Sequence, residues 1–186
     1  TAPMPTRYQL QQALLSFSGD AWIEDDAGNR VFEVDGKAFA IGRTLDLLDP
    51  GGAVLYTLHQ RVLSLHSTFE IRRGDALVAT VQKALFTFLG DRFEIERTDG
   101  PTLEAKGDFL DHEFAVRDGD DVVVTATRAW FSMHDTYGVE VADGFDDALG
   151  LAIVIAIEQL ESAERRSGPG FGGIAGSMGG VGPPSG

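Results

Sequence analysis

The chain has 186 residues, 43% of them hydrophobic, which is enough for one domain with a sizeable core. Its net charge of −14 argues against a general binder of nucleic acid or anionic membrane, because attraction to phosphate needs clustered Lys and Arg, but it leaves room for a local basic patch. The lack of cysteine excludes disulfides, thiolate nucleophiles and the usual structural zinc sites, so packing must supply the stability.

The N-terminal stretch TAPMPTRYQL lacks the basic region and apolar core of a signal peptide. No apolar run reaches the roughly 18 residues of a membrane-spanning helix. We therefore expect a cytoplasmic protein with no transmembrane segment, and leave peripheral attachment to a membrane open. Residues 1–7 are expected to be flexible and residues 8–166 to form the single domain.

From Trp22 to Val141 the sequence is typical of a β protein, because short runs of alternating apolar and polar residues are separated by turn signals. The run RVFEVDG follows the turn DDAGN, and DPGG then separates TLDLL from AVLYTLHQ. Further breaks at RRGD, LGDR, TDGP, RDGD and TYG predict roughly ten to twelve strands joined as hairpins.

An internal repeat favours a sheet built by repetition, the alternative being that any two hairpins with a Gly-Asp turn look alike. IRRGDALVATVQKALFTF, from Ile71, aligns without a gap with VRDGDDVVVTATRAWFSM, from Val116, and seven of the eighteen positions are identical. The cations Lys83 and Arg128 occupy equivalent positions. In both copies Gly-Asp is a hairpin-turn signal, which explains RGD better than a cell-adhesion motif does.

The period changes after Gly144, and residues 146–164 are predicted to form a helix capped by Asp143 or Asp146. Ala148 to Ile157 carry no polar side chain, so this helix has no face for water and must be enclosed by protein. At about 1.5 Å per residue this apolar run is about 15 Å long, half of a membrane crossing. Glu158, Glu161 and Glu164 are expected to mark its emergence into water.

The remaining residues, 167–186, form a Gly/Pro-rich segment that is predicted to be disordered. An antiparallel sheet of this many strands can close on itself, which removes its edges, and can hold the helix in its lumen. We therefore predict a closed β-barrel of about twelve strands around a central hydrophobic C-terminal helix.

The segments DDAGNRVFEVDGK and LHQRVLSLHSTFEI, followed by the apolar helix, resemble the LURP-one-related family. This family is grouped with the tubby C-terminal domain and the phospholipid scramblases, and the resemblance covers about residues 8–164. It implies a twelve-stranded barrel around a central helix. It supplies no catalytic motif, and the acidic charge of this chain departs from that of a lipid binder.

Other motifs give little support for catalysis or metal binding. The four histidines are His59, His66, His112 and His134, and the pair His134-Asp135 lacks the further ligands of a metal phosphohydrolase. The acidic clusters EDDAGN and RDGDD lack the spacing of a calcium-binding loop. We expect neither a metal nor a cofactor, and no enzymatic activity.

Six basic residues interrupt apolar strands: Lys37, Arg43, Arg61, Lys83, Lys106 and Arg128. They are either ion-pair partners scattered over the surface or a local anion site, for which Lys83, Arg128, Arg61 and Lys37 are the candidates. We expect a monomeric, non-enzymatic binding or scaffold protein that recognises a lipid headgroup or another anionic small molecule and does not bind nucleic acid. The alternative is a structural or protein-interaction module with no small-molecule ligand.

Overall fold

The computed structural model describes residues 4–11, 21–38, 42–63, 66–84, 90–130 and 136–167, except the side chains of residues 37, 38, 63 and 167. These residues form twelve strands and one helix. The elements are β1 (Thr6–Gln11), β2 (Ala21–Asp25), β3 (Arg30–Ala38), β4 (Arg43–Leu48), β5 (Val54–Leu63), β6 (His66–Arg73), β7 (Ala76–Lys83), β8 (Arg92–Arg97), β9 (Leu103–Asp108), β10 (Glu113–Asp118), β11 (Asp121–Thr127), β12 (Thr136–Val141) and α1 (Asp147–Ser167). β1 begins two residues before the predicted start of the domain, and the predicted tail beyond α1 lies outside the described residues.

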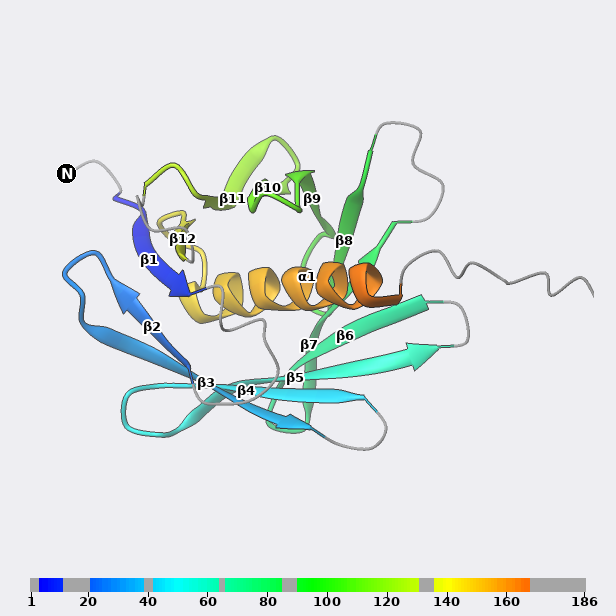
Figure 1. Ribbon diagram of the computed structural model, residues 1–186, viewed down its shortest axis with the longest axis horizontal. Coiled ribbons are helices and arrows are strands. Elements are labelled where there is room, and N and C mark those ends of the chain that lie inside the picture. Colours follow the sequence, from blue (N-terminus) through cyan, green and yellow to red (C-terminus); the bar gives the residue numbers. More distant parts are fainter. Residues whose placement is uncertain are drawn as a thin grey trace, which may run out of the picture.

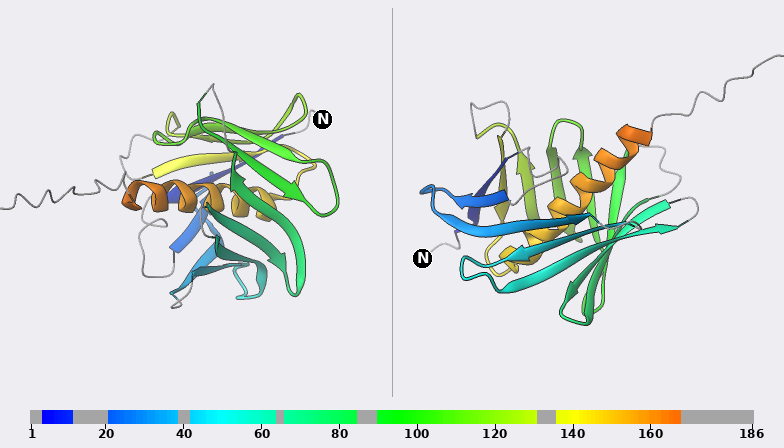
Figure 2. Two further views of the ribbon diagram at one scale, coloured as in Figure 1. Left: turned by 90° about the vertical axis from the view of Figure 1, so that its right-hand side faces the viewer. Right: turned by 60° about the horizontal axis from the view of Figure 1, so that its bottom comes forward.

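The sheet is a closed barrel in which each strand pairs antiparallel with its neighbours in sequence. It closes where β1 pairs with β12, in a register that joins Thr6 to Val141 and Gln11 to Thr136. Closure leaves none of the described strands as a free edge, although β1 and β2 pair at only two positions, Tyr8 with Asp25 and Gln9 with Glu24. The predicted fold class is thus confirmed, and Figures 1 and 2 show the strands wrapped around α1.

The helix α1 fills the lumen. Every residue from Leu151 to Leu160 is buried, and the inward side chains of the strands pack against them in one hydrophobic core. Gly150 lies so close to the wall that an added Cβ would sit 3.1 Å from Val124 and Val141. An apolar helix of this kind needs a dry surface on all sides, which the barrel provides. The helix ends at Ser167, three residues beyond the predicted end.

Two aspartates anchor the start of α1 to the wall. The Asp146 carboxylate accepts a hydrogen bond from the Leu149 amide at 2.9 Å, which caps the helix, and another from Tyr56 at 2.8 Å. The Tyr8 hydroxyl donates to Asp147 at 2.8 Å. Burial and the bonded carboxylates raise the pKa of Tyr56 to about 12 and also raise that of Tyr8. Both tyrosines therefore stay protonated donors at neutral pH.

The two copies of the sequence repeat form two hairpins with the same local structure. The hairpins β6–β7 and β10–β11 turn at Gly74 and Gly119, whose φ angles are 58° and 60°. Each hairpin has a register shift before the second residue of its repeat, at Arg72 and Arg117. In each, this arginine donates to a turn carbonyl, Asp75 at 2.9 Å and Asp120 at 3.0 Å. RGD at residues 73–75 is thus part of a tight turn, as predicted.

The acidic cluster before β3 is also a turn. The Asp25 carboxylate accepts hydrogen bonds from the amides of Ala27 and Asn29, at 2.9 and 2.8 Å, and from the Asn29 side chain. These bonds lower the pKa of Asp25, with the Asn29 side chain contributing most. Asp49 binds the amides of Gly51 and Ala53 in the same way. Hydrogen bonding within the turns therefore explains why aspartate occurs at these positions.

Candidate binding site at the exit end of the barrel

The two ends of the barrel differ in charge. The turn end is the end where α1 begins, and it carries the hairpin connections 26–29, 49–53, 74–75, 98–102 and 119–120. Aspartates dominate it, namely Asp25, Asp26, Asp49, Asp75, Asp99, Asp118, Asp120, Asp121, Asp143, Asp146 and Asp147. Four of its arginines are bonded within it: Arg72 and Arg117 to the turn carbonyls, Arg73 to Asp146 and Arg97 to Asp118.

The exit end is the opposite end, where α1 ends. All six cations that interrupt apolar strands lie toward it, because β3, β5, β7, β9 and β11 run toward this end and β4 starts from it. Arg165 and Arg166 in the last turn of α1 join them. Closure of the barrel thus gathers residues that are separated by up to 129 positions in sequence, from Lys37 to Arg166.

Inside the exit end, three buried polar residues of α1 each contact a different wall element. Glu158 contacts His112 of the β9–β10 connection, Gln159 accepts a hydrogen bond from Arg43 of β4, and Glu161 pairs with Lys83 of β7. We call these six residues the polar collar. Glu158 and Glu161 are only 1% and 3% exposed, so the prediction that they mark the emergence of the helix into water is wrong. Wall residues bind them instead, and the helix emerges only at Glu164.

Lys83 is the most heavily paired cation of the collar. It lies on the inward face of β7, in line with Ala79 and Val81, and its ammonium is 2.6 Å from Glu164 and 3.1 Å from both Glu161 and Asp91. Burial lowers the pKa of this ammonium, but the three carboxylates outweigh that effect and raise the pKa above its ordinary value. Lys83 therefore ties α1 and the start of β8 to the wall, and an anion would have to displace one of these carboxylates to bind it.

His112 and Glu158 form a second buried contact in the collar. The His112 Nδ1 atom is 2.5 Å from a Glu158 carboxylate oxygen, and the ring stacks on Tyr137 at 4.7 Å between centroids. Burial raises the pKa of Glu158, an effect that the bond with His112 only partly offsets. Both side chains are only 1% exposed, so the pair is part of the core at this end of the barrel. Nothing in the sequence around His112 indicates this partnership.

Three of the predicted cations point away from the lumen or sit beyond a strand end. The side chains of Arg61 and Lys106 are 53% and 57% exposed, and they lie near Glu70 at 3.7 Å and Glu104 at 2.5 Å. Arg128 follows β11 and is half-buried, and its amide donates to Glu113 at 2.7 Å. Within the described residues its guanidinium has no ion pair. Among the described side chains of the six cations, Arg61 and Lys106 are the exposed ones, and Arg128 is half-buried.

The four cations of the predicted anion site lie at the exit end of the barrel, but their positions are spread over different faces of the wall. Lys83 points into the lumen, Arg61 points outward, and Arg128 lies at the position equivalent to Lys83, four strands further around the barrel. Lys37 lies in β3 opposite Thr44, and its side chain lies outside the described part. As an anion site, these four residues stay a prediction.

Three of the four histidines, His59, His66 and His112, lie in the described part of the chain. His59 bonds the Thr44 hydroxyl at 2.9 Å on the outer surface, and His66 is exposed at the start of β6. His134 lies outside the described residues. Across the segments that the structure describes, no group of three His, Asp or Glu side chains has the arrangement to hold a metal ion. In those segments, too, no helix combines the length and apolar character that a membrane crossing needs.

Comparison with known proteins adds to this geometry. Residues 6–158 match the family described as LURP-one-related. A Bacillus subtilis relative, "Uncharacterized protein YxjI", is 30% identical over 151 residues, which cover 81% of this chain and 91% of that protein. "Protein LURP-one-related 14" of Arabidopsis thaliana is 23% identical, over 86% of this chain and 87% of its own length. An X-ray structure of an Arabidopsis thaliana protein shares the fold, with a TM-score of 0.63 and 21% identity over 86% of this chain and 93% of that one.

Proposed function

Because the chain belongs to the LURP-one-related family, we propose that it is a non-enzymatic binding protein that recognises an anionic group, such as a lipid headgroup, at the exit end of its barrel. The observation that carries the proposal is the position of the cations. In a chain with net charge −14, the six cations that interrupt apolar strands all lie toward one end, together with Arg165 and Arg166. These cations are spread around one end of the barrel, with Arg61 and Arg128 six strands apart, so they can contact several phosphates of an anionic surface at once.

The binding surface is the outside of the barrel, because α1 occupies the lumen. The apolar part of α1 is buried by the wall, and its polar residues Glu158, Gln159 and Glu161 are bonded in the collar. A ligand inside would have to displace the helix. The pair of His112 and Glu158 is an unfavourable place for catalysis, since both side chains are only 1% exposed.

Arg61, Lys106 and Arg128 make the first contact with the anion in this proposal, since solvent reaches them. Lys83 lies just inside the rim and can take part only where an anion displaces one of its three carboxylates, and Lys37 is the fifth member of the site. The Arg61–Glu70 contact is long, at 3.7 Å, and exposed pairs of this kind are worth about 0–1 kcal/mol. An incoming phosphate can therefore replace the carboxylate at little cost. The aspartates of the turn end orient the molecule with its exit end toward the anionic surface.

Vesicle flotation tests the proposal. At low salt we expect the protein to float with phosphatidylcholine vesicles that contain phosphatidylserine and not with phosphatidylcholine alone. Binding should fall on raising the salt to physiological strength, where the Debye length is about 8 Å. Titration with soluble glycerol phosphate, followed by calorimetry, separates recognition of a free phosphate from recognition of a lipid surface.

The test variant is Arg61→Glu plus Arg128→Glu, and the matched control is Arg30→Glu, an exposed arginine at the turn end. The double variant should lose binding and the control should keep it. Lys83→Glu is a poor test, because it would leave Asp91, Glu161 and Glu164 without their cation and destabilise the helix. If the wild type neither floats with anionic vesicles nor binds glycerol phosphate, the chain acts as a structural or protein-interaction module instead.

A further inference from the structure

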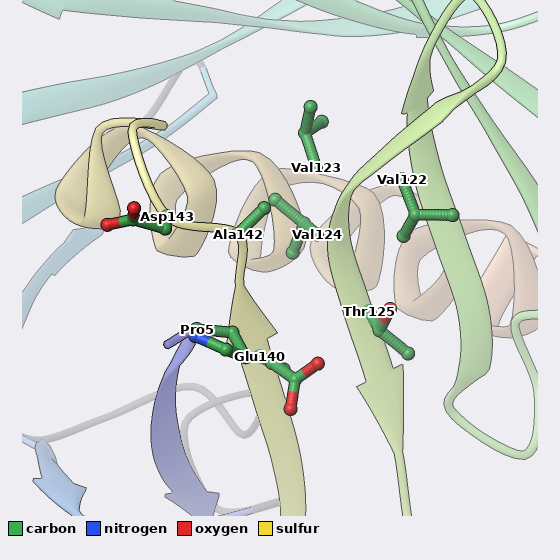
Figure 3. Close-up of a pocket in the computed structure, with 8 residues that line it drawn as sticks. All are labelled: Pro5, Val122, Val123, Val124, Thr125, Glu140, Ala142 and Asp143. Atoms are coloured by element: carbon green, nitrogen blue, oxygen red, sulfur yellow. The ribbon is translucent and has the colours of Figure 1, made fainter. Parts of the chain in front are cut away.

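A groove crosses the outer surface of the barrel at the turn end, far from the proposed anion site. It has a volume of about 300 Å³ and lies between β11 and the chain that leaves β12 (Figure 3). The residues that line it are Pro5, Val122, Val123, Val124, Thr125, Glu140, Ala142 and Asp143. Its floor is the wall itself, where Thr125 of β11 faces Glu140 of β12 across the ladder.

The repeat explains why the surface is open here. In the first copy, β7 is followed by β8, and Thr80 faces Glu96 just as Thr125 faces Glu140 in the second copy. β8 then continues into a hairpin, in which the Thr98 amide and hydroxyl donate to Val78 and Leu77 at 2.9 and 2.8 Å.

In the second copy, the chain turns inward after β12 to begin α1. Ala142 stands where Thr98 does, and its amide donates to Val123 at 2.9 Å, but it has no hydroxyl to reach back to β11. On the far side, β1 starts only at Thr6. Within the part of the chain that the structure describes, no hairpin covers this stretch of β11, so the groove follows from the chain leaving the sheet to fill the lumen.

The lining combines apolar side chains with acidic ones. Val122 is 38% exposed, the same as Leu77 at the equivalent position of the first hairpin, and it is one of the residues that line the groove. Asp143 at one end is exposed, and Glu140 on the floor shares its charge with Arg7 at 2.8 Å. The aspartates of the turn end add to the negative potential, which raises the local concentration of cationic groups.

We propose that this groove binds an extended segment of a partner protein in which aliphatic residues alternate with Lys or Arg. The aliphatic side chains fill the space beside Val122 and Pro5, and the cations reach Asp143 and Glu140. A contact this small is transient rather than permanent, because stable interfaces bury about 1,200–2,000 Å².

Charge complementarity favours a cationic partner segment over two other occupants, namely a second copy of the chain and the chain's own residues 168–186. A second copy would bring the acidic turn ends of two molecules together, and like charges oppose that contact. Residues 168–186 of this chain contain no Lys or Arg, so they offer nothing to Asp143. The proposal concerns the turn end alone, so it does not depend on anion binding at the exit end.

A labelled synthetic peptide tests the proposal by fluorescence anisotropy. The probe is a short acetylated and amidated peptide in which lysine alternates with valine. One control peptide has glutamate in place of lysine, and the other has serine in place of valine. We expect the wild-type chain to bind only the lysine–valine peptide. Equal binding of the lysine–serine peptide would mean that charge alone attracts the peptide, and would overturn the proposal that the groove binds its aliphatic side chains.

Two variants and two matched controls locate the site. Val122→Ser and Asp143→Lys should each weaken binding by about tenfold or more, which is about 1.4 kcal/mol. Leu77→Ser and Asp99→Lys change equally exposed residues of the turn end outside the groove, and should leave binding nearly unchanged.

Three further results would overturn the proposal. The first is equal weakening by the matched controls, and the second is no binding of the peptide by a wild-type chain that melts cooperatively. The third is a change of occupant. Light scattering that shows a dimer dissociated by Val122→Ser would assign the groove to a second copy, and tighter peptide binding after removal of residues 168–186 would assign it to the chain's own tail.

Discussion

Ile153→Asp tests whether α1 is enclosed on every side. Ile153 lies in the middle of the helix and is fully buried, with wall residues around it. Truncating a buried isoleucine costs about 2–5 kcal/mol, and placing an unpaired polar group at such a site costs about 1–3 kcal/mol more. The sum is comparable with the whole stability of a domain, about 5–15 kcal/mol. We therefore expect Ile153→Asp to be unfolded or close to it at neutral pH.

Urea unfolding followed by circular dichroism gives the free energies. Ile153→Val should cost only about 0.5–1.5 kcal/mol, because it removes one methyl group. Arg165→Asp, at an exposed position of the same helix, should cost less than about 1 kcal/mol. The loss in Ile153→Asp should shrink as the pH falls, since burial favours the protonated carboxyl.

An Ile153→Asp protein that unfolds cooperatively within about 1 kcal/mol of the wild type would refute this reasoning. Such a result would mean that water reaches the middle of α1. The lumen would then be open to a ligand, and the proposal that binding occurs on the outside would lose its basis.

Two further predictions concern stability. The pKa of Glu158 is raised in the folded chain, so its contribution to stability is present at low pH and is lost as the pH rises through the folded value. The melting temperature of Glu158→Gln relative to that of the wild type should therefore be higher at pH 8 than at pH 4. An unchanged difference in melting temperature would contradict the burial of this carboxyl. Gly107 has φ of 145°, and an added Cβ would lie 2.3 Å from the Glu113 carbonyl oxygen, whereas Gly119 has φ of 60° with open space around it. Gly119→Ala should thus cost about 1–2 kcal/mol and Gly107→Ala clearly more, and equal losses in urea unfolding would show that the β9–β10 contact is looser than described.

The predictions that succeeded depend on local pattern. Alternation of apolar residues over Trp22 to Val141 indicated strands, because side chains along a strand point to opposite faces. The ten apolar residues from Ala148 indicated an enclosed helix, because a helix points side chains in every direction. The repeat predicted two equivalent hairpins, and shared turn residues gave them the same bulge and the same arginine bond.

Part of the candidate site also followed from the sequence. Cations that interrupt apolar strands are conspicuous, and all six were identified from that pattern. Their common end could not be read from any one segment, because it depends on the direction of each strand in the closed barrel. The ion pairs could not be predicted from the sequence either. Lys83 and Glu161 are 78 residues apart, and only the register of β7 against α1 brings them together.

Tertiary structure alone decided which polar groups are buried. Glu158 and Glu161 follow an apolar run, and as part of an isolated helix they would lie in water. The wall extends past them and presents His112 and Lys83, which are distant in sequence. Lys83 pairs with Glu161, whereas His112 only partly offsets the cost of burying Glu158. The groove at Val122 also depends on tertiary structure, because it lies where the chain leaves β12 and the sheet to become the helix. Periodicity fixes whether a segment is strand or helix, but partners and openings depend on how the barrel closes around α1.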